Sequence, residues 1–145
     1  MFGLPEPRPD DAARALACAK DLVEVIARWS VKKEGHPAIR NGIGIHYGDL
    51  FCGIIGEDMR LEFTVLGDTV NVAARMEQAT KAHGVPILVS EAACRAAGPD
   101  AGDWREVSRV PLRGRAEVMA YFTPAKLNET ADLGIPVSRL AGAGA

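Results

Sequence analysis

The chain has 145 residues, of which 48% are hydrophobic and 25% charged, the composition of one soluble globular domain. Its 17 lysines and arginines stand against 19 acidic residues, for a net charge of -2, which argues against a nucleic-acid partner. No apolar run approaches the roughly 18 residues that cross a bilayer, and the N-terminus lacks a signal-peptide pattern, so we expect a cytoplasmic domain without direct membrane contact.

The first half of the chain predicts one long helix and two strands. Asp10 is a suitable N-cap for a helix that runs to about Trp29. From Ile39 the hydrophobic period changes to two, and residues 43–47 and 50–55 predict two strands. Gly48-Asp49 between them favours a hairpin. The apolar face of the helix comprises Leu16, Ala19, Leu22, Val23, Ile26 and Trp29.

A third strand and a second helix follow. Residues 61–66 alternate apolar and polar side chains up to Gly67, which places Thr64 away from the core face. Asp68-Thr69 is a suitable N-cap for a helix through about Ala79. Its apolar stripe comprises Val72, Met76 and Ala79.

The last elements are short. Residues 86–89 predict a buried strand, and Ser90 is expected to cap a small helix that ends at Gly98. Two further strands are predicted near residues 106–112 and 118–122. The order of elements predicts an α+β fold, in which helices pack on a mixed or antiparallel sheet.

The second helix carries the strongest chemical signal. Asn71 and Arg75 are spaced i,i+4, so they share one helix face, opposite Val72 and Met76 and near a helix N-terminus that favours anions. An amide beside a guanidinium is a suitable pair for charge that develops on a phosphoryl oxygen. The plain alternative is an exposed helix face with a solvated arginine.

The residues around this helix favour the first of these interpretations. The runs NGIGIHYGDLFCGIIG and LEFTVLGDTVNVAARME, followed by ILVS and a late LRGR, closely resemble the class III nucleotidyl cyclases, the family of adenylyl and guanylyl cyclase catalytic domains. The resemblance covers about Met1 to Pro124. It implies a ferredoxin-like fold with helices on one face of the sheet. It also implies pairing with a second copy or another cyclase domain, and active sites at the dimer interface.

The resemblance assigns roles to four residues. Asn71 and Arg75 match the pair that orients the ribose and stabilises the α-phosphate as the 3′-hydroxyl attacks it and pyrophosphate leaves. Thr64 matches the position that selects the purine, where threonine favours ATP, although a hydroxyl both donates and accepts. Arg113 matches a basic residue near the triphosphate. The alternatives are a strand threonine on a polar face and a solvated hairpin charge.

The resemblance also implies two divalent ions, Mg²⁺ or Mn²⁺, held by two aspartates. Phe2-Gly3-Leu4-Pro5 matches the end of the strand that follows the second of these aspartates, so both are expected upstream of Met1. The first strand, first helices and second strand of the family fold are expected there too. Without the aspartates, this exact chain should lack most catalytic power. A non-catalytic module that binds nucleotide or dimerises is the alternative function.

The remaining expectations concern boundaries and side chains without a role. We expect a partial cyclase domain over residues 1–127 and a flexible tail over residues 128–145. His46 and His83 have no partner at metal-ligand spacing, which argues against a metal role. The cysteines are expected to be reduced, buried and inert; they are Cys18, Cys52 and Cys94.

Overall fold

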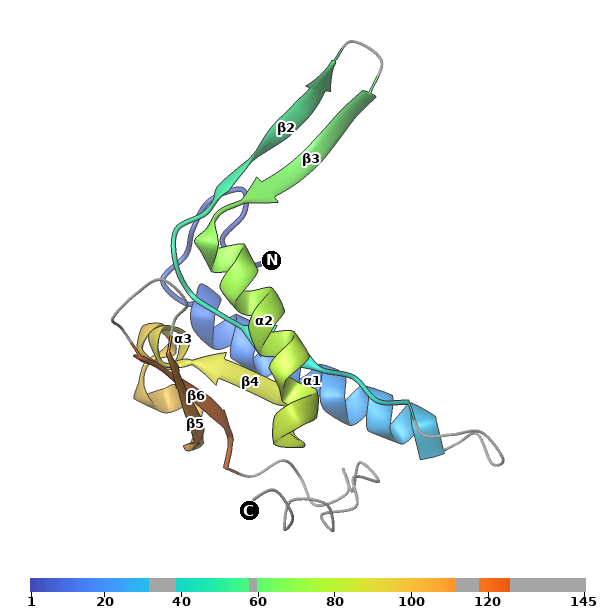
Figure 1. Ribbon diagram of the computed structural model, residues 1–145, viewed down its shortest axis with the longest axis vertical. Helices are drawn as coiled ribbons and strands as arrows, with labels where there is room; N and C mark the ends of the chain where they lie inside the picture. The colour runs from blue at the N-terminus through green and yellow to red at the C-terminus, as the bar shows by residue number, and fades with distance from the viewer. Residues whose placement is uncertain (32–38, 58–59, 112–117, 126–145) are drawn as a thin grey trace.

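The computed structural model describes residues 1–31, 39–57, 60–111 and 118–125 (Figure 1). The predicted tail, residues 128–145, lies outside these ranges. No helix within them combines the length and the apolar character that crossing a bilayer requires. The elements are α1 (Asp11–Val31), β1 (Ile43–Ile45), β2 (Phe51–Glu57), β3 (Arg60–Leu66), α2 (Asp68–His83), β4 (Ile87–Ser90), α3 (Glu91–Ala97), the 3₁₀ turn η1 (Pro99–Ala101), β5 (Trp104–Pro111) and β6 (Val118–Pro124).

Four of the strands form one mixed sheet in the order β1-β4-β6-β5. β1 and β4 run parallel, whereas β4–β6 and β5–β6 are antiparallel. β2 and β3 form a separate two-stranded hairpin that extends away from this sheet (Figure 1). The α+β class with a mixed sheet, predicted from the order of elements, is confirmed.

The predicted hairpin between residues 43–47 and 50–55 is wrong. β1 pairs with β4, and the strand that begins at Phe51 pairs with β3 instead. The glycines that alternate with Ile43 and Ile45 indicate a strand. Which strand it pairs with depends on where the two isoleucine side chains are buried. The two isoleucines pack against the core between β4 and α1, which a pairing with the extended hairpin would not provide.

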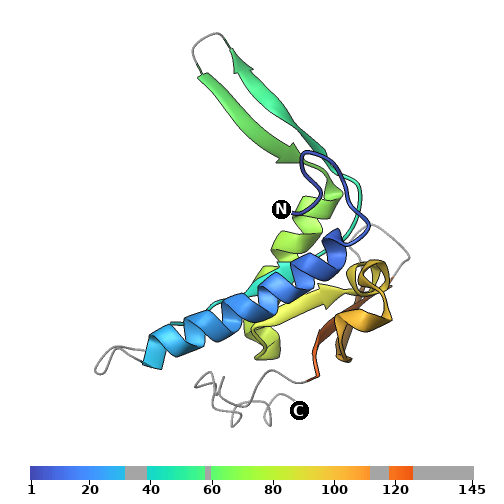
Figure 2. The ribbon, with the colours of Figure 1, turned by 180° about the vertical axis from the view of Figure 1, so that it is seen from behind.

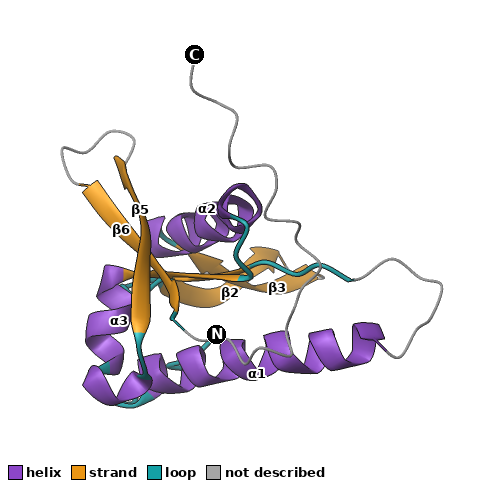
Figure 3. Cartoon of the chain, turned by 90° about the horizontal axis from the view of Figure 1, so that it is seen from below, coloured by secondary structure: helices purple, strands orange, loops and turns teal. Residues whose placement is uncertain are grey.

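The central strand β4 is buried on both faces. Ile87 and Val89 pack with the α1 side chains Leu16, Ala19 and Val23 and with α3. Leu88 points the other way, onto Val72 and Met76 of α2 and onto Tyr121. The expectation of helices on one face is therefore wrong, because a strand that is apolar on both faces needs cover on both (Figures 2 and 3).

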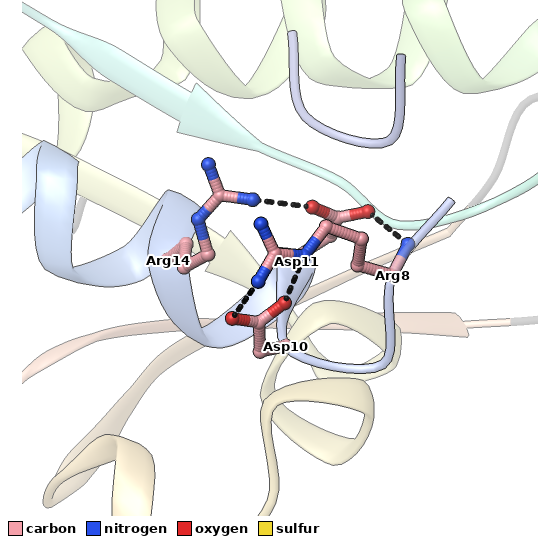
Figure 4. A network of polar contacts seen from close by, with 4 residues as sticks. All are labelled: Arg8, Asp10, Asp11 and Arg14. Atoms are coloured by element: carbon pink, nitrogen blue, oxygen red, sulfur yellow. Dashed lines mark hydrogen bonds and ion pairs between the residues drawn. The ribbon is translucent and has the colours of Figure 1, made fainter. Parts of the chain in front are cut away.

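The start of α1 is organised by Asp11 rather than by Asp10 (Figure 4). The Arg8 backbone N–H donates to Asp11 Oδ2 at 2.6 Å, and Arg14 Nη1 donates to Asp11 Oδ1 at 3.0 Å. Asp11 thus closes the turn that precedes the helix. Asp10 lies at the predicted cap position, where its backbone carbonyl oxygen accepts from the Arg14 N–H at 2.9 Å, but its carboxylate forms an exposed ion pair with Arg8.

The predicted apolar face of α1 is only partly buried. Leu16, Ala19 and Val23 lie in the core, whereas Leu22 is 47% exposed and Trp29 is 53% exposed. The buried stripe is therefore narrower than the predicted one. It ends before the last turns of α1, which extend past the edge of the sheet (Figure 2).

Two glycines allow α2 to lie directly on β1. A Cβ atom at Gly44 would fall on the carbonyl oxygen of Ala73 and the amide nitrogen of Glu77, which are backbone atoms of α2. A Cβ atom at Gly42 would fall on the Thr80 hydroxyl. No side chain larger than hydrogen fits between this strand and this helix.

Gly44→Ala should lower the free energy of unfolding by about 3 kcal/mol, because helix backbone cannot yield as a side chain can. Gly53→Ala is the matched control, since a Cβ there meets only the Phe51 ring at 3.1 Å. We expect the control to change stability by less than about 1 kcal/mol. Urea unfolding of both variants measures the difference, and equal losses would contradict the close packing.

Candidate functional site

Asn71 and Arg75 lie on the exposed face of α2. Both side chains are exposed, while Val72 and Met76, on the opposite face, are buried at 3% and 0%. Asn71 is in the first turn of the helix and Arg75 is one turn later. The structure thus places the amide and the guanidinium together on one accessible face, as the i,i+4 spacing predicts.

The N-terminus of α2 is fixed to the loop before β2. Gly67 precedes the helix with φ of 147°, a conformation that glycine adopts readily, and no side-chain hydrogen bond caps the helix. The predicted cap at Asp68-Thr69 is therefore wrong. The Thr69 hydroxyl instead donates to the carbonyl oxygen of Asp49 at 2.6 Å. This contact fixes the first turn of α2 to the loop that precedes β2.

Thr64 lies on β3, directly opposite Gly53 of β2. Direct partners in a ladder share a face of the hairpin, so one face carries Phe51, Gly53, Thr64 and Leu66, here called the Thr64 face. The opposite face, here called the Ile54 face, carries Cys52, Ile54, Phe63 and Val65. Gly67 separates β3 from α2, so the hairpin leads directly into the helix that bears Asn71 and Arg75 (Figure 1).

Two further sequence expectations concern this site. Arg113 lies outside the described residues. Within the described ranges, no group of three or more His, Cys, Asp or Glu side chains is close enough together to hold a metal ion. The described residues therefore do not fit the implied pair of divalent ions.

His46 makes a contact that its sequence position did not reveal. Its Nδ1 lies 2.9 Å from the Ser90 hydroxyl oxygen, which also accepts a hydrogen bond from the Ala93 N–H and so caps α3 as predicted. The Ser90 hydroxyl has one hydrogen and two lone pairs, so the tautomer of His46 determines whether Nδ1 donates or accepts in this contact. Burial lowers the pKa of His46 below its ordinary value, and the nearby charge of Asp68 partly offsets this.

The three cysteines are free, but they are less buried than predicted. Cys18 is exposed, and Cys52 and Cys94 are half-buried. Burial raises the pKa of the Cys94 thiol to about 11, and the charge of Glu91 adds to this effect. Cys94 is therefore protonated at neutral pH, which agrees with the expectation of an inert thiol.

A cavity of about 530 Å³ lies at the other end of α2. It is bounded by residues 39–42, by the last turns of α2 and by residues 84–86. The amide of Asn41, which is one of the lining residues, is buried without a hydrogen-bond partner. Neither Thr64, Asn71 nor Arg75 lines this cavity.

The sequence and the fold both match those of known proteins. The family model for the adenylate and guanylate cyclase catalytic domain matches residues 1–125. The chain belongs to this family. The predicted resemblance to the class III nucleotidyl cyclases is thereby confirmed.

Similar cyclases include adenylate cyclases of two bacteria. The chain is 38% identical over 92 residues to the adenylate cyclase of Anabaena cylindrica. This alignment covers 62% of the chain and 18% of the relative. It is 31% identical over 124 residues to adenylate cyclase 1 of Rhizobium meliloti, covering 84% of the chain and 18% of the relative. The chain therefore spans roughly a fifth of the length of these relatives.

A solved cyclase structure has the same fold. The guanylyl cyclase Cya2 superposes with a TM-score of 0.71 at 26% identity, over 93% of this chain and 68% of that one. Adenylate and guanylate cyclases thus both occur among the similar proteins. Membership of the family therefore does not determine which nucleotide is bound, and that choice depends on the side chains of the site.

The cyclase domain should lose stability as His46 is protonated. Because the folded pKa lies below the ordinary value of 6.5, the unfolded chain binds more protons as the pH falls through 6.5. The free energy of unfolding should therefore fall between pH 7.5 and 5.5, above the range in which carboxylates titrate. Chemical unfolding across this range measures the slope. His46→Gln should flatten it, and an unchanged slope in this variant would contradict the assignment.

Proposed function

We propose that the chain is the nucleotide-holding part of an adenylate cyclase catalytic domain, which converts ATP to 3′,5′-cyclic AMP and pyrophosphate. The observation that carries the proposal is the exposed Asn71–Arg75 pair on the first turns of α2 in a chain of this family. The names of the two bacterial relatives support adenylate rather than guanylate. The Thr64 hydroxyl, which the sequence assigns to the purine, favours the same choice.

The role proposed for Asn71 and Arg75 is to stabilise negative charge in the transition state. The ribose 3′-oxygen forms a bond to the α-phosphorus, its proton leaves to solvent, and the bond from the α-phosphorus to the pyrophosphate oxygen breaks. Negative charge develops on the α-phosphate oxygens during this displacement. We assign Arg75 to the stabilisation of this charge, because its guanidinium group offers several donors in a fixed geometry. We assign Asn71 to the orientation of the ribose. Arg113 stays a proposed contact of the triphosphate.

We propose a second copy of the chain, or another cyclase domain, as the partner of the hairpin. Ile54 is 67% exposed, and its direct cross-strand partner Phe63 is 62% exposed. A two-stranded hairpin is marginal without cover, and two large apolar side chains in contact with water favour an interface. The divalent ions, the domain boundary near residue 127 and the cytoplasmic location stay predictions.

Asn71→Ala and Arg75→Ala should each lower kcat about 100- to 1,000-fold and change KM much less, because the lost donors act mainly in the transition state. Gln78→Ala is the matched control, since Gln78 is exposed on the same face of α2, one turn after Arg75. The assay measures cyclic AMP formed by the longest natural gene product that contains this sequence. If that protein is active and both variants match the control, the assignment is wrong. ATP binding without turnover would favour the non-catalytic module.

Ile54→Glu and Phe63→Glu should each shift the protein from dimer to monomer, because either change places a charge on the Ile54 face. Val25→Glu is the control, since Val25 is exposed to a similar extent, 53%, but lies on α1. Analytical ultracentrifugation of the three variants and the parent chain measures the masses. A dimer that survives both hairpin substitutions would contradict this interface.

A further inference from the structure

The Phe51 ring lies against the backbone of its own strand. A Cβ atom at Gly53 would come within 3.1 Å of both Cε1 and Cζ of this ring, so the ring reaches two residues along β2 and covers Gly53. Gly53 is the direct cross-strand partner of Thr64. The ring therefore extends over the cross-strand partner of Thr64, on the face that Phe51 and Thr64 share.

The ring is also accessible. Phe51 is 61% exposed even though one side of the ring covers Gly53. Gly53 offers no side chain of its own between Phe51 and Thr64, and Thr64 is only half-buried. The Thr64 face thus carries an exposed aromatic side chain on β2 and a half-buried threonine on β3.

This pairing of groups matches the chemistry of a nucleobase. Every base has a π face that stacks on an aromatic side chain, and its edge carries donors and acceptors for a hydroxyl. We propose that Phe51 is a binding residue for the purine, whose face packs on the ring while its edge meets Thr64. This inference rests on the function proposed above and adds a nucleotide contact that the sequence motifs did not indicate.

Phe51 and Thr64 are expected to contribute differently to the recognition of the base. Stacking is nearly independent of which base is bound, so Phe51 supplies affinity for adenine and guanine alike. The Thr64 hydroxyl is the group that hydrogen-bonds to the edge of the base and so distinguishes adenine from guanine. Phe51→Ala should therefore weaken ATP and GTP binding by the same factor and leave their ratio unchanged.

The competing role for Phe51 is structural, since an aromatic side chain can cover a strand glycine and protect its backbone. Two variants separate the roles. Phe51→Leu keeps an apolar cover over Gly53 but removes the π face, whereas Phe51→Trp keeps a π face. Val25→Ala, on α1, is the control for an exposed apolar side chain far from the hairpin.

Calorimetric titration of the chain with ATP in the presence of Mg²⁺ tests the proposal. Phe51→Ala and Phe51→Leu should bind ATP about tenfold more weakly than the parent chain, since stacking on one base is worth about that factor or more. Phe51→Trp and Val25→Ala should bind within about threefold of the parent. Tryptophan fluorescence of Phe51→Trp, corrected for the parent chain, should be quenched by ATP and by adenosine but not by inorganic tripolyphosphate.

The outcomes separate this proposal from the proposed function. If the parent chain binds ATP and Phe51→Leu binds it equally well, Phe51 only covers the strand and the inference is overturned. Quenching by tripolyphosphate alone would overturn it as well, because the ring would then sense the phosphates. A parent chain that binds neither ATP nor GTP would overturn the nucleotide-holding function, and this inference with it.

Discussion

The contact between α2 and β1 through glycine determines how the candidate site is presented. Gly44 lets the strand lie against the backbone of the helix at Ala73 and Glu77. With the axis of α2 held there, the Val72–Met76 face must point into the core, onto Leu88 and Tyr121. The opposite face, which carries Asn71 and Arg75, is then directed outward. The position of the chemical groups thus follows from backbone packing rather than from contacts of their own.

The helices and strands could be predicted well from local pattern, because the cap of α3 at Ser90 and the strand before it are local features. The pairing of strands could not. The alternation of Ile43 and Ile45 with glycine indicates an extended segment. Its partner β4 lies more than 40 residues away and is chosen by the burial of both faces of the sheet. For the same reason Leu22 and Trp29, which fit the period of the helix, extend past the core.

The candidate site was predictable where it depends on one helix. The spacing of Asn71 and Arg75 defines a common face, and the burial of Val72 and Met76 determines which face is exposed. Phe51 and His46 could not be found in this way. The position of the Phe51 ring depends on its side-chain conformation and on the register of β2 with β3. The His46–Ser90 contact joins two residues that are 44 positions apart in the sequence. Both require the three-dimensional arrangement.

We expect nucleotide to lie across the Thr64 face and the first turns of α2. Amide NMR spectra of the isotope-labelled chain, titrated with ATP and Mg²⁺, test this directly. The largest shift changes should fall in residues 51–53 and 64–72, with smaller changes along the rest of α2. Changes confined to residues 39–42 and 84–86, which line the cavity at the far end of α2, would contradict it.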